Sequence, residues 1–275
     1  MALLVATDLD GTLLDTTYPK LEAALAIDSV AQAYPGVCVV LASSKTLPEM
    51  IDIAKLCESD PLLLFENGAG FAWRETRLCG SGSRQYAGFE VECTGVDYAQ
   101  IREVLLALRR SASYQFRGFG DMTVAEVAER TGLDTRSAAD ARDRLATEPI
   151  EWLGDASSLE QFRADLASWG LGLERGGQFH HVASHMNKQR ALRRLVKQIR
   201  YQTGDRVITL ACGDAPNDLD MLQQADRALV FPQSEGGYLL PEGEGVWHAP
   251  KAGPATWLAC VSRVIESQAR EALAI

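Results

Sequence analysis

Two aspartates, Asp8 and Asp10, stand one residue apart after a short apolar run at the start of the chain, and a Gly-Thr pair follows them. Such a short run predicts a buried strand. Strand alternation would send both carboxylates to one face, where like charges repel and unpaired burial is costly. A hard divalent cation with oxygen ligands is the simplest positive partner. The alternative interpretation is an ordinary polar turn at a strand end.

Further polar residues follow other apolar runs. Ser43 comes after the run 37–42, Asp214 follows the run 206–211, and Lys188 opens a basic amphipathic segment. Ligands of open α/β sheets bind outside the carboxyl ends of the strands, so parallel strands would gather these groups at one edge. Taken singly, Ser43 could cap a helix, Lys188 could be an exposed first-turn lysine, and Asp214 could belong to a plain turn.

The elements that must position these residues alternate between strand and helix. A helix is predicted over 20–34, and Pro35-Gly36 ends it. Its apolar residues lie mostly on one side: Leu21, Leu25, Ile27, Val30, Ala31 and Tyr34. Thr46 begins another helix, with Glu49 at the capping-box position, and 61–65 is a third apolar strand. Strands alternating with helices predict an α/β fold with a parallel sheet and helices on both faces.

The alternation lapses between residues 84 and 186, where the chain is less apolar. We interpret this segment as an inserted α+β domain, and residues 1–83 and 187–275 as the core domain. In the insert we predict helices over 97–112, 123–131, 134–146 and 157–169, and strands near residues 90, 114, 150, 171 and 179. After it we predict a helix over 188–201, strands over 206–211, 227–231 and 246–249, and a helix over 254–274.

The composition restricts the class of protein. The chain has 275 residues, 47% of them hydrophobic, which is ordinary for a globular protein. A net charge of −10 argues against a nucleic-acid partner. The sequence predicts neither a membrane span nor a signal-type segment, and it does not define the oligomeric state. Six cysteines without a CxxC pair favour free thiols in a reducing cytoplasm, buried at Cys38, Cys57, Cys212 and Cys260.

The run Asp8-Leu9-Asp10-Gly11-Thr12 after an N-terminal apolar strand resembles the first motif of the haloacid dehalogenase (HAD) superfamily, mostly Mg²⁺-dependent phosphatases. The resemblance implies a Rossmann-like HAD core. It makes Asp8 the nucleophile that forms an aspartyl-phosphate and Asp10 the general acid and base. Ser43 and Lys188 match the residues that bind the phosphoryl oxygens.

The resemblance also implies a Mg²⁺ cofactor. The metal ligands would be Asp8, the backbone carbonyl of Asp10, and Asp214, with Asn217 and Asp218 supporting the metal shell. Mg²⁺ usually takes one or two carboxylates and keeps several waters, which this set satisfies.

The insert follows Glu66-Asn67-Gly68 after the third strand, and this position resembles the C2B-type cap of the Cof-like branch. Several segments are similar to mannosyl-3-phosphoglycerate phosphatases, and together with the core motifs they make the resemblance span essentially the whole chain. One departure is Gln189, where Gly is expected. The similar segments are 43–46, 117–123, 126–128, 131–133, 148–150 and 176–180.

That family hydrolyses 2-O-mannosyl-3-phosphoglycerate to mannosylglycerate and phosphate, a step of mannosylglycerate biosynthesis. The partner would be this small phosphorylated sugar-glycerate. An arginine suits its carboxylate through the planar guanidinium fork. The residues that we expect to recognise glycerate and sugar are Arg117, Asp121, Thr123, Arg175 and His180. A solvated surface arginine is the alternative for Arg117 and Arg175, and a plain helix cap is the alternative for Thr123.

Other functions remain open at this point. The same chemistry would serve glucosyl-3-phosphoglycerate or another sugar or polyol phosphate. A metal-free dehalogenase is disfavoured because it does not need Asp10. A ligand-binding sensor on a degenerate fold is disfavoured because every core motif residue is present. Hinges near residues 80–82 and 185–187 would let the cap close and exclude water.

Overall fold

The computed structural model describes residues 2–74, 84–176, 178–185, 187–239 and 244–273. The hinge expected at 80–82 and Cys79 lie outside this range, as does residue 186 of the second hinge. Cys57 and Cys212 are buried free thiols, whereas Cys38 and Cys260 are half-buried. Among the described residues, no helix has both the length and the apolar character needed to cross a membrane.

Nine strands of the described chain form one large sheet in the order β13-β12-β11-β1-β2-β3-β4-β6-β5. The strands from β13 to β3 run parallel, and β4, β6 and β5 extend the sheet antiparallel. The parallel sheet is as predicted, but the antiparallel extension was not. The strands are β1 (Ala2–Thr7), β2 (Val37–Ala42), β3 (Leu62–Phe65), β4 (Gly70–Trp73), β5 (Arg84–Tyr86), β6 (Phe89–Cys93), β11 (Val207–Gly213), β12 (Arg227–Val230) and β13 (Val246–His248).

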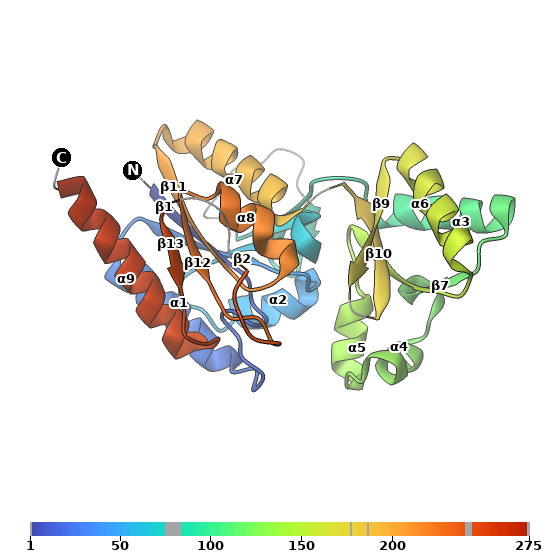
Figure 1. Cartoon of the computed structure of the whole chain (residues 1–275), viewed down its shortest axis with the longest axis horizontal. Coiled ribbons are helices and arrows are strands. Elements are labelled where there is room, and N and C mark those ends of the chain that lie inside the picture. The colour runs from blue at the N-terminus through green and yellow to red at the C-terminus, as the bar shows by residue number, and fades with distance from the viewer. Residues whose placement is uncertain (1, 75–83, 177, 186, 240–243, 274–275) are drawn as a thin grey trace.

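Helices cover both faces of the large sheet (Figure 1). The helices α1 (Lys20–Ala33), α2 (Leu47–Ala54) and α9 (Pro254–Leu273) pack on one face, around the fully buried Trp257. The helices α7 (Lys188–Thr203) and α8 (Leu219–Gln224) pack on the other. These two apolar layers hold the carboxyl ends of the parallel strands in one row.

The predicted apolar side of α1 is confirmed at Ile27 and Val30, which are fully buried, and wrong at Leu21 and Leu25, which are 56% and 57% exposed. Ala23 and Ala24 are fully buried in their place. The small alanine side chains allow the helix backbone to lie close to the sheet and to α9, and a leucine would not fit there.

A second sheet of four antiparallel strands lies beside the first, in the order β7-β8-β10-β9. Its strands are β7 (Phe116–Gly118), β8 (Thr147–Trp152), β9 (Leu171–Gly176) and β10 (Phe179–Ser184). The helices α3 (Tyr98–Ala112) and α6 (Ala156–Ser168) pack on one face of this sheet. On the other face lie α4 (Val124–Thr131) and α5 (Thr135–Arg142). We call residues 98–184 the cap.

The boundary of the insert differs from the prediction, which placed residues 84–186 in the cap. The strand expected near residue 90 exists as β6, but it pairs with β4, and β5 pairs with β6, in the large sheet. Phe89 and Val91 are buried in the core cluster of that sheet. Burial of this apolar pair against the core therefore places 84–93 with the core domain.

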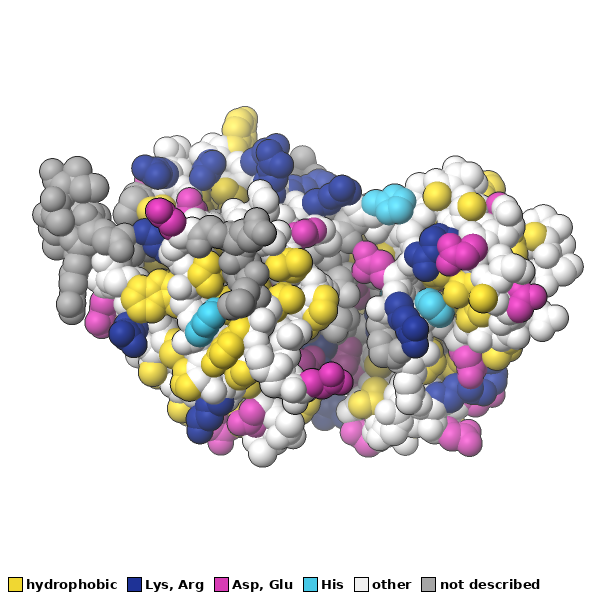
Figure 2. All heavy atoms as spheres, in the orientation of Figure 1, with side chains coloured by type: hydrophobic (Ala, Val, Ile, Leu, Met, Phe, Trp, Pro, Cys, Tyr) yellow, Lys and Arg dark blue, Asp and Glu magenta, His cyan; other side chains and the backbone are white. Residues whose placement is uncertain are grey.

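The cap contacts the core through α5, which lies beside α2. The Thr46 hydroxyl, just before α2, donates to the Asp140 carbonyl of α5 at 2.8 Å. The Glu66 carboxylate, just after β3, accepts hydrogen bonds from the cap residues Leu145 and Thr147 at 2.9 and 2.6 Å. On the face that Figure 2 shows, a groove runs between the two domains.

Candidate active site

Asp8 stands at the carboxyl end of β1, between the ends of β2 and β11. Its carboxylate is buried and its Oδ1 lies 2.8 Å from the Nζ of Lys188, the first residue of α7. The same Nζ lies 2.7 Å from Asp218 Oδ1, and the Lys188 side chain is 1% exposed. The structure therefore brings together three of the predicted residues, with the carboxylates of Asp8 and Asp218 on either side of the Lys188 ammonium group.

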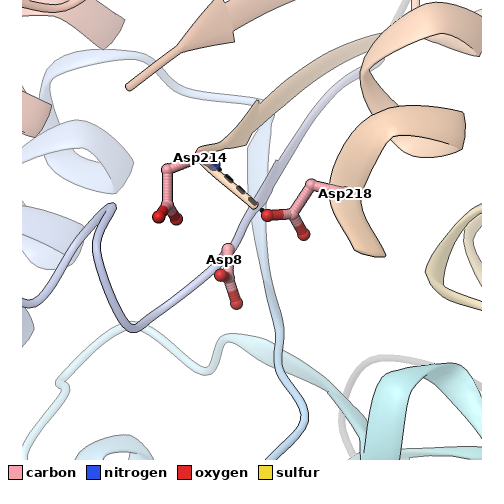
Figure 3. A group of neighbouring side chains, drawn as sticks. All are labelled: Asp8, Asp214 and Asp218. Carbon is pink, nitrogen blue, oxygen red and sulfur yellow. Dashed lines mark hydrogen bonds between the residues drawn. The ribbon is translucent and has the colours of Figure 1, made fainter. Parts of the chain in front are cut away.

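Asp214 and Asp218 come from the turn after β11 (Figure 3). Asp218 Oδ2 accepts from the backbone N–H groups of Asp214 and Ala215 at 3.2 and 3.1 Å, which fixes the turn. Thr12 donates its hydroxyl to Asp214 Oδ1 at 2.9 Å. Gly11, at φ +77°, lies so close to Asp214 that a Cβ at this position would stand 2.4 Å from Asp214 Oδ2.

The donor set fits a divalent cation. Oxygen atoms of Asp8, Asp214 and Asp218 all lie within 4.8 Å of one another, and carboxylate oxygens are the ligands that Mg²⁺ prefers. Burial raises the pKa of Asp8 despite Lys188, and burial raises the pKa of Asp214 to about 6 despite the Thr12 hydrogen bond. Burial lowers the pKa of Lys188, but the nearby carboxylates of Asp8 and Asp218 raise it by more, so the pKa of the ammonium group lies above its usual value. Since one ammonium offsets three carboxylates incompletely, a Mg²⁺ ion would supply the missing positive charge.

The side chain of Asp10 points to a pair of residues that the sequence analysis did not single out. Tyr18 donates its hydroxyl to Asp10 Oδ1, and Lys45 Nζ lies 3.0 Å from Asp10 Oδ2. Lys45 also donates to the Tyr18 oxygen at 3.0 Å. Lys45 lies in the segment 43–46 on which the resemblance partly rests, whereas the sequence around Tyr18 carries no signal for this contact. Both cations at this edge, Lys45 and Lys188, thus contact motif carboxylates.

Ser43 follows β2 directly and is fully buried at the same edge. Its Oγ accepts from the Lys45 backbone N–H at 3.2 Å, which leaves the hydroxyl hydrogen available as a donor. Asn187 caps α7, because its side chain accepts from the Arg190 N–H at 2.9 Å. The departure at Gln189 therefore leaves the start of the helix intact, and Lys188 takes the expected place.

Asn217 is exposed, and its amide donates to Asn67 Oδ1 at 3.1 Å. This hydrogen bond ties the turn after β11 to the loop after β3. Asn217 thus lies one residue from Asp218 and supports the turn that carries it.

Three of the predicted cap residues are engaged within the cap itself. Arg117 forms an ion pair with Glu126. Asp121 lies 2.5 Å from each of Arg102 and Arg109, which hold its pKa below the usual range although burial opposes them. Thr123 caps α4 in a capping box with Glu126, which is the helix-cap alternative given for it in the sequence analysis. These contacts order the cap.

Arg175 and His180 lie on the far face of the cap sheet. His180 is opposite both Ile150 and Arg175 in the antiparallel register, so the three side chains share one face. Ile150 is buried in the cluster formed with α3 and α6, whereas the core contacts α5 on the opposite face. The structure therefore does not bring Arg175 and His180 to the groove. Burial and Arg175 lower the pKa of His180.

A cleft of about 390 Å³ lies between the two domains. Tyr18, Lys45 and Glu49 line it from the core, and Arg136 and Asp140 line it from α5. Two of these lining residues, Tyr18 and Lys45, contact the Asp10 carboxylate, so the cleft is linked to Asp10 through them.

This arrangement, a mostly parallel sheet beside a second sheet of four antiparallel strands, is similar to the folds of solved HAD-superfamily hydrolases. A phosphatase of the HAD superfamily from Bacteroides thetaiotaomicron matches with a TM-score of 0.61 and 18% identity, covering 96% of this chain and 95% of that one. A haloacid dehalogenase-like hydrolase from the same organism matches with a TM-score of 0.65 and 16% identity over 96% of this chain and 100% of that one. A haloacid dehalogenase-like hydrolase from B. subtilis matches with a TM-score of 0.54 and 18% identity, covering 82% of this chain and 88% of that one.

No family model matches the chain. At these levels of identity the likeness concerns the fold, and the chemistry has to be argued from the site.

Proposed function

We propose that the chain is a Mg²⁺-dependent phosphomonoesterase, and that its substrate is 2-O-mannosyl-3-phosphoglycerate. The observation that carries the proposal is the group of Asp8, Asp214 and Asp218 at the carboxyl edge of a parallel sheet, with Lys188 between Asp8 and Asp218. The HAD phosphatase from Bacteroides thetaiotaomicron supports the reaction class through its shared fold.

Asp8 would act as the nucleophile. Lys188 holds Oδ1, so Oδ2 is the atom that attacks phosphorus while the bond from phosphorus to the ester oxygen breaks. Asp10, in its protonated form, transfers its proton to the leaving alkoxide and becomes a carboxylate. It then takes a proton from a water that attacks the aspartyl-phosphate, which releases phosphate and restores the Asp8 carboxylate.

The surrounding residues would orient these groups and offset charge. Lys188 and the Ser43 hydroxyl would bind phosphoryl oxygens, and Tyr18 and Lys45 would hold the Asp10 carboxylate beside the leaving group. The ligands of Mg²⁺ would be Asp8, Asp214 and the Asp10 backbone carbonyl. When bound, Mg²⁺ would neutralise charge on the phosphoryl group and on the carboxylates.

The sugar and glycerate parts would lie in the cleft beside Asp10. Its lining carries cations such as Arg136 for a carboxylate, and Glu49 and Asp140 for hydroxyl groups. We therefore move the proposed recognition of the leaving group from Arg175 and His180 to this cleft.

The test is phosphate release with Mg²⁺ from mannosyl-3-phosphoglycerate, glucosyl-3-phosphoglycerate, 3-phosphoglycerate, mannose-6-phosphate and p-nitrophenyl phosphate. We expect the mannosyl compound to be preferred, and Asp8→Asn to abolish release while the fold persists. Preference for another ester would retain the reaction and reject the substrate. No release from any ester, with Mg²⁺ bound, would favour a ligand-binding sensor over a phosphatase.

A further inference from the structure

A cavity of about 470 Å³ lies within the cap, apart from the cleft beside Asp10. Its lining comes from residues 98–144, and its volume is in the range of small-molecule sites. The residues that matter for its chemistry are Tyr98, Arg102, Gly120, Ala139, Arg142 and Arg144.

Two of its three arginines, Arg142 and Arg144, donate hydrogen bonds to neutral groups. Arg144 is buried, and it donates to the Ala141 carbonyl at 3.0 Å and to the Thr147 hydroxyl at 2.8 Å. Arg142 donates its Nε–H to the Phe119 carbonyl at 3.2 Å, and the Arg144 guanidinium lies 6.0 Å from the centre of the Phe119 ring. Both cations thus meet at Phe119 with neutral partners. In the part of the chain that the structure describes, neither forms an ion pair within 4.0 Å.

The neighbouring arginine is already paired with carboxylates. Arg102, the third arginine, lies 2.7 Å from Glu148 and 2.5 Å from Asp121. The Asp143 carboxylate, which also lines the cavity, accepts a hydrogen bond from the neutral Tyr86 hydroxyl of the core. A buried charge is costly without a counter-charge, and an anion in the cavity would give Arg142 and Arg144 a direct one, in addition to the longer-range attraction between Arg144 and Glu148.

We propose that this cavity binds the oxyanion group of a small organic acid, a carboxylate or a phosphate, between Arg142 and Arg144. Guanidinium groups present parallel N–H donors that match both oxyanions. The acid is either the carboxylate-bearing part of the phosphatase substrate or a separate ligand. Only the first of these two sources depends on the proposed function.

The test uses the full chain without Mg²⁺ and follows backbone amide signals by NMR during titration with sodium D-glycerate. A sodium chloride titration of equal ionic strength is the reference. We expect the Gly120 and Ala139 signals to shift and saturate with glycerate alone. In Arg142→Met the apparent Kd should rise about tenfold or more. In Arg144→Lys, which keeps the buried charge and removes the planar fork, it should rise as well.

Arg110→Met is the matched control, because Arg110 is an exposed arginine of the cap outside the cavity lining. It should bind glycerate like the natural chain. Absent shifts, equal shifts with chloride, shifts confined to residues 8–11, or unchanged affinity in both cavity variants would overturn the proposal. Glycerate carries no phosphate, so this result does not depend on phosphatase activity.

The source of the acid follows from the ratio of kcat/KM for 3-phosphoglycerate to kcat/KM for p-nitrophenyl phosphate. If the substrate supplies the acid, this ratio should fall in Arg142→Met. If the acid is a separate ligand, the ratio should equal that of Arg110→Met while glycerate binding is still lost. Inactivity of every variant and of the natural chain toward all esters would reject the proposed function and leave the anion site standing.

Discussion

Gly11 determines how closely the loop after β1 approaches Asp214. Gly11→Ala would add a Cβ 2.4 Å from Asp214 Oδ2 and displace that carboxylate. We expect Mg²⁺-dependent phosphatase activity to fall about 100-fold, since a misplacement of about 1 Å at a reacting site can cost this much. The measurement is kcat/KM with p-nitrophenyl phosphate.

Gly132 provides the control for that substitution. It also has a positive φ, +74°, but a Cβ there would meet nothing within 4 Å. Both alanine variants carry the cost of a left-handed backbone, about 1–2 kcal/mol, in urea unfolding. Equal activities of the two variants would contradict a positional role for Gly11.

Asp214 makes the response to Mg²⁺ depend on pH. Its pKa is raised to about 6 by burial, so in the metal-free protein the stability that it contributes is present below about pH 4 and is lost as the pH rises through 6. Protons compete with Mg²⁺ for the same carboxylate. We therefore expect the rise in Tm on adding Mg²⁺ to be larger at pH 7.5 than at pH 5, measured by thermal unfolding.

Asp214→Asn should remove most of this rise at both pH values. Asp165→Asn, a carboxylate of the cap that accepts from Tyr114 at 2.6 Å, should retain the rise. An undiminished rise in Asp214→Asn would show that Mg²⁺ acts elsewhere on the protein.

The sequence predicts which core residues lie close together better than it predicts the surroundings of the cap residues. Asp8, Lys188 and Asp218 follow apolar strands or open a helix, so local sequence places them at one edge, and the structure brings them into contact. The contact of Tyr18 with Asp10 depends on the path of the loop 15–19, which no periodicity encodes. The face of the cap sheet on which Arg175 lies was not predicted, because face selection in a strand depends on which helices cover the sheet, and that is a tertiary property.

At the scale of elements, the N-terminus of α7 places Lys188 between two carboxylates. Asn187→Ala removes the cap hydrogen bond to the Arg190 N–H and should destabilise the fold by about 1 kcal/mol. It should also lower kcat, because the first turn then frays around Lys188. Urea unfolding and steady-state kinetics measure the two effects.

Asp97→Ala is the matched control at the N-terminus of α3, where the Asp97 side chain accepts from the Gln100 N–H at 3.0 Å. It should cost similar stability with kcat retained. A similar loss of kcat in both variants would attribute the effect to general destabilisation.

Helix positions were predictable because capping boxes and glycine stops are local. The helix starting after Thr46 and the helix ending before Pro35-Gly36 illustrate this. Strand partners were less predictable: β5 and β6 read as part of the insert, yet they join the large sheet because β4 offers a free edge and Phe89 a side chain for its core. Pairing between strands far apart in sequence has no local signal.

At the scale of the whole molecule, Glu66 joins the two domains. It is a buried acceptor of two backbone N–H groups and the Thr147 hydroxyl of the cap, and it lies at φ +50° just after β3. Glu66→Gln keeps the shape but turns one oxygen into an N–H₂ group that faces donors. An unsatisfied buried group of this kind costs about 1–3 kcal/mol.

Because those contacts hold the cap beside the catalytic edge, Glu66→Gln should loosen the domains without unfolding either. We expect a larger radius of gyration by small-angle X-ray scattering and a higher KM for the preferred ester. Thr147→Val removes only one of the three donors, so its effects should be smaller and of the same sign. If Glu66→Gln leaves both the radius of gyration and KM unchanged, the domains are held by the contact between α2 and α5 instead. Thr46→Val, which removes the hydrogen bond to the Asp140 carbonyl, should then change both quantities more than Glu66→Gln does.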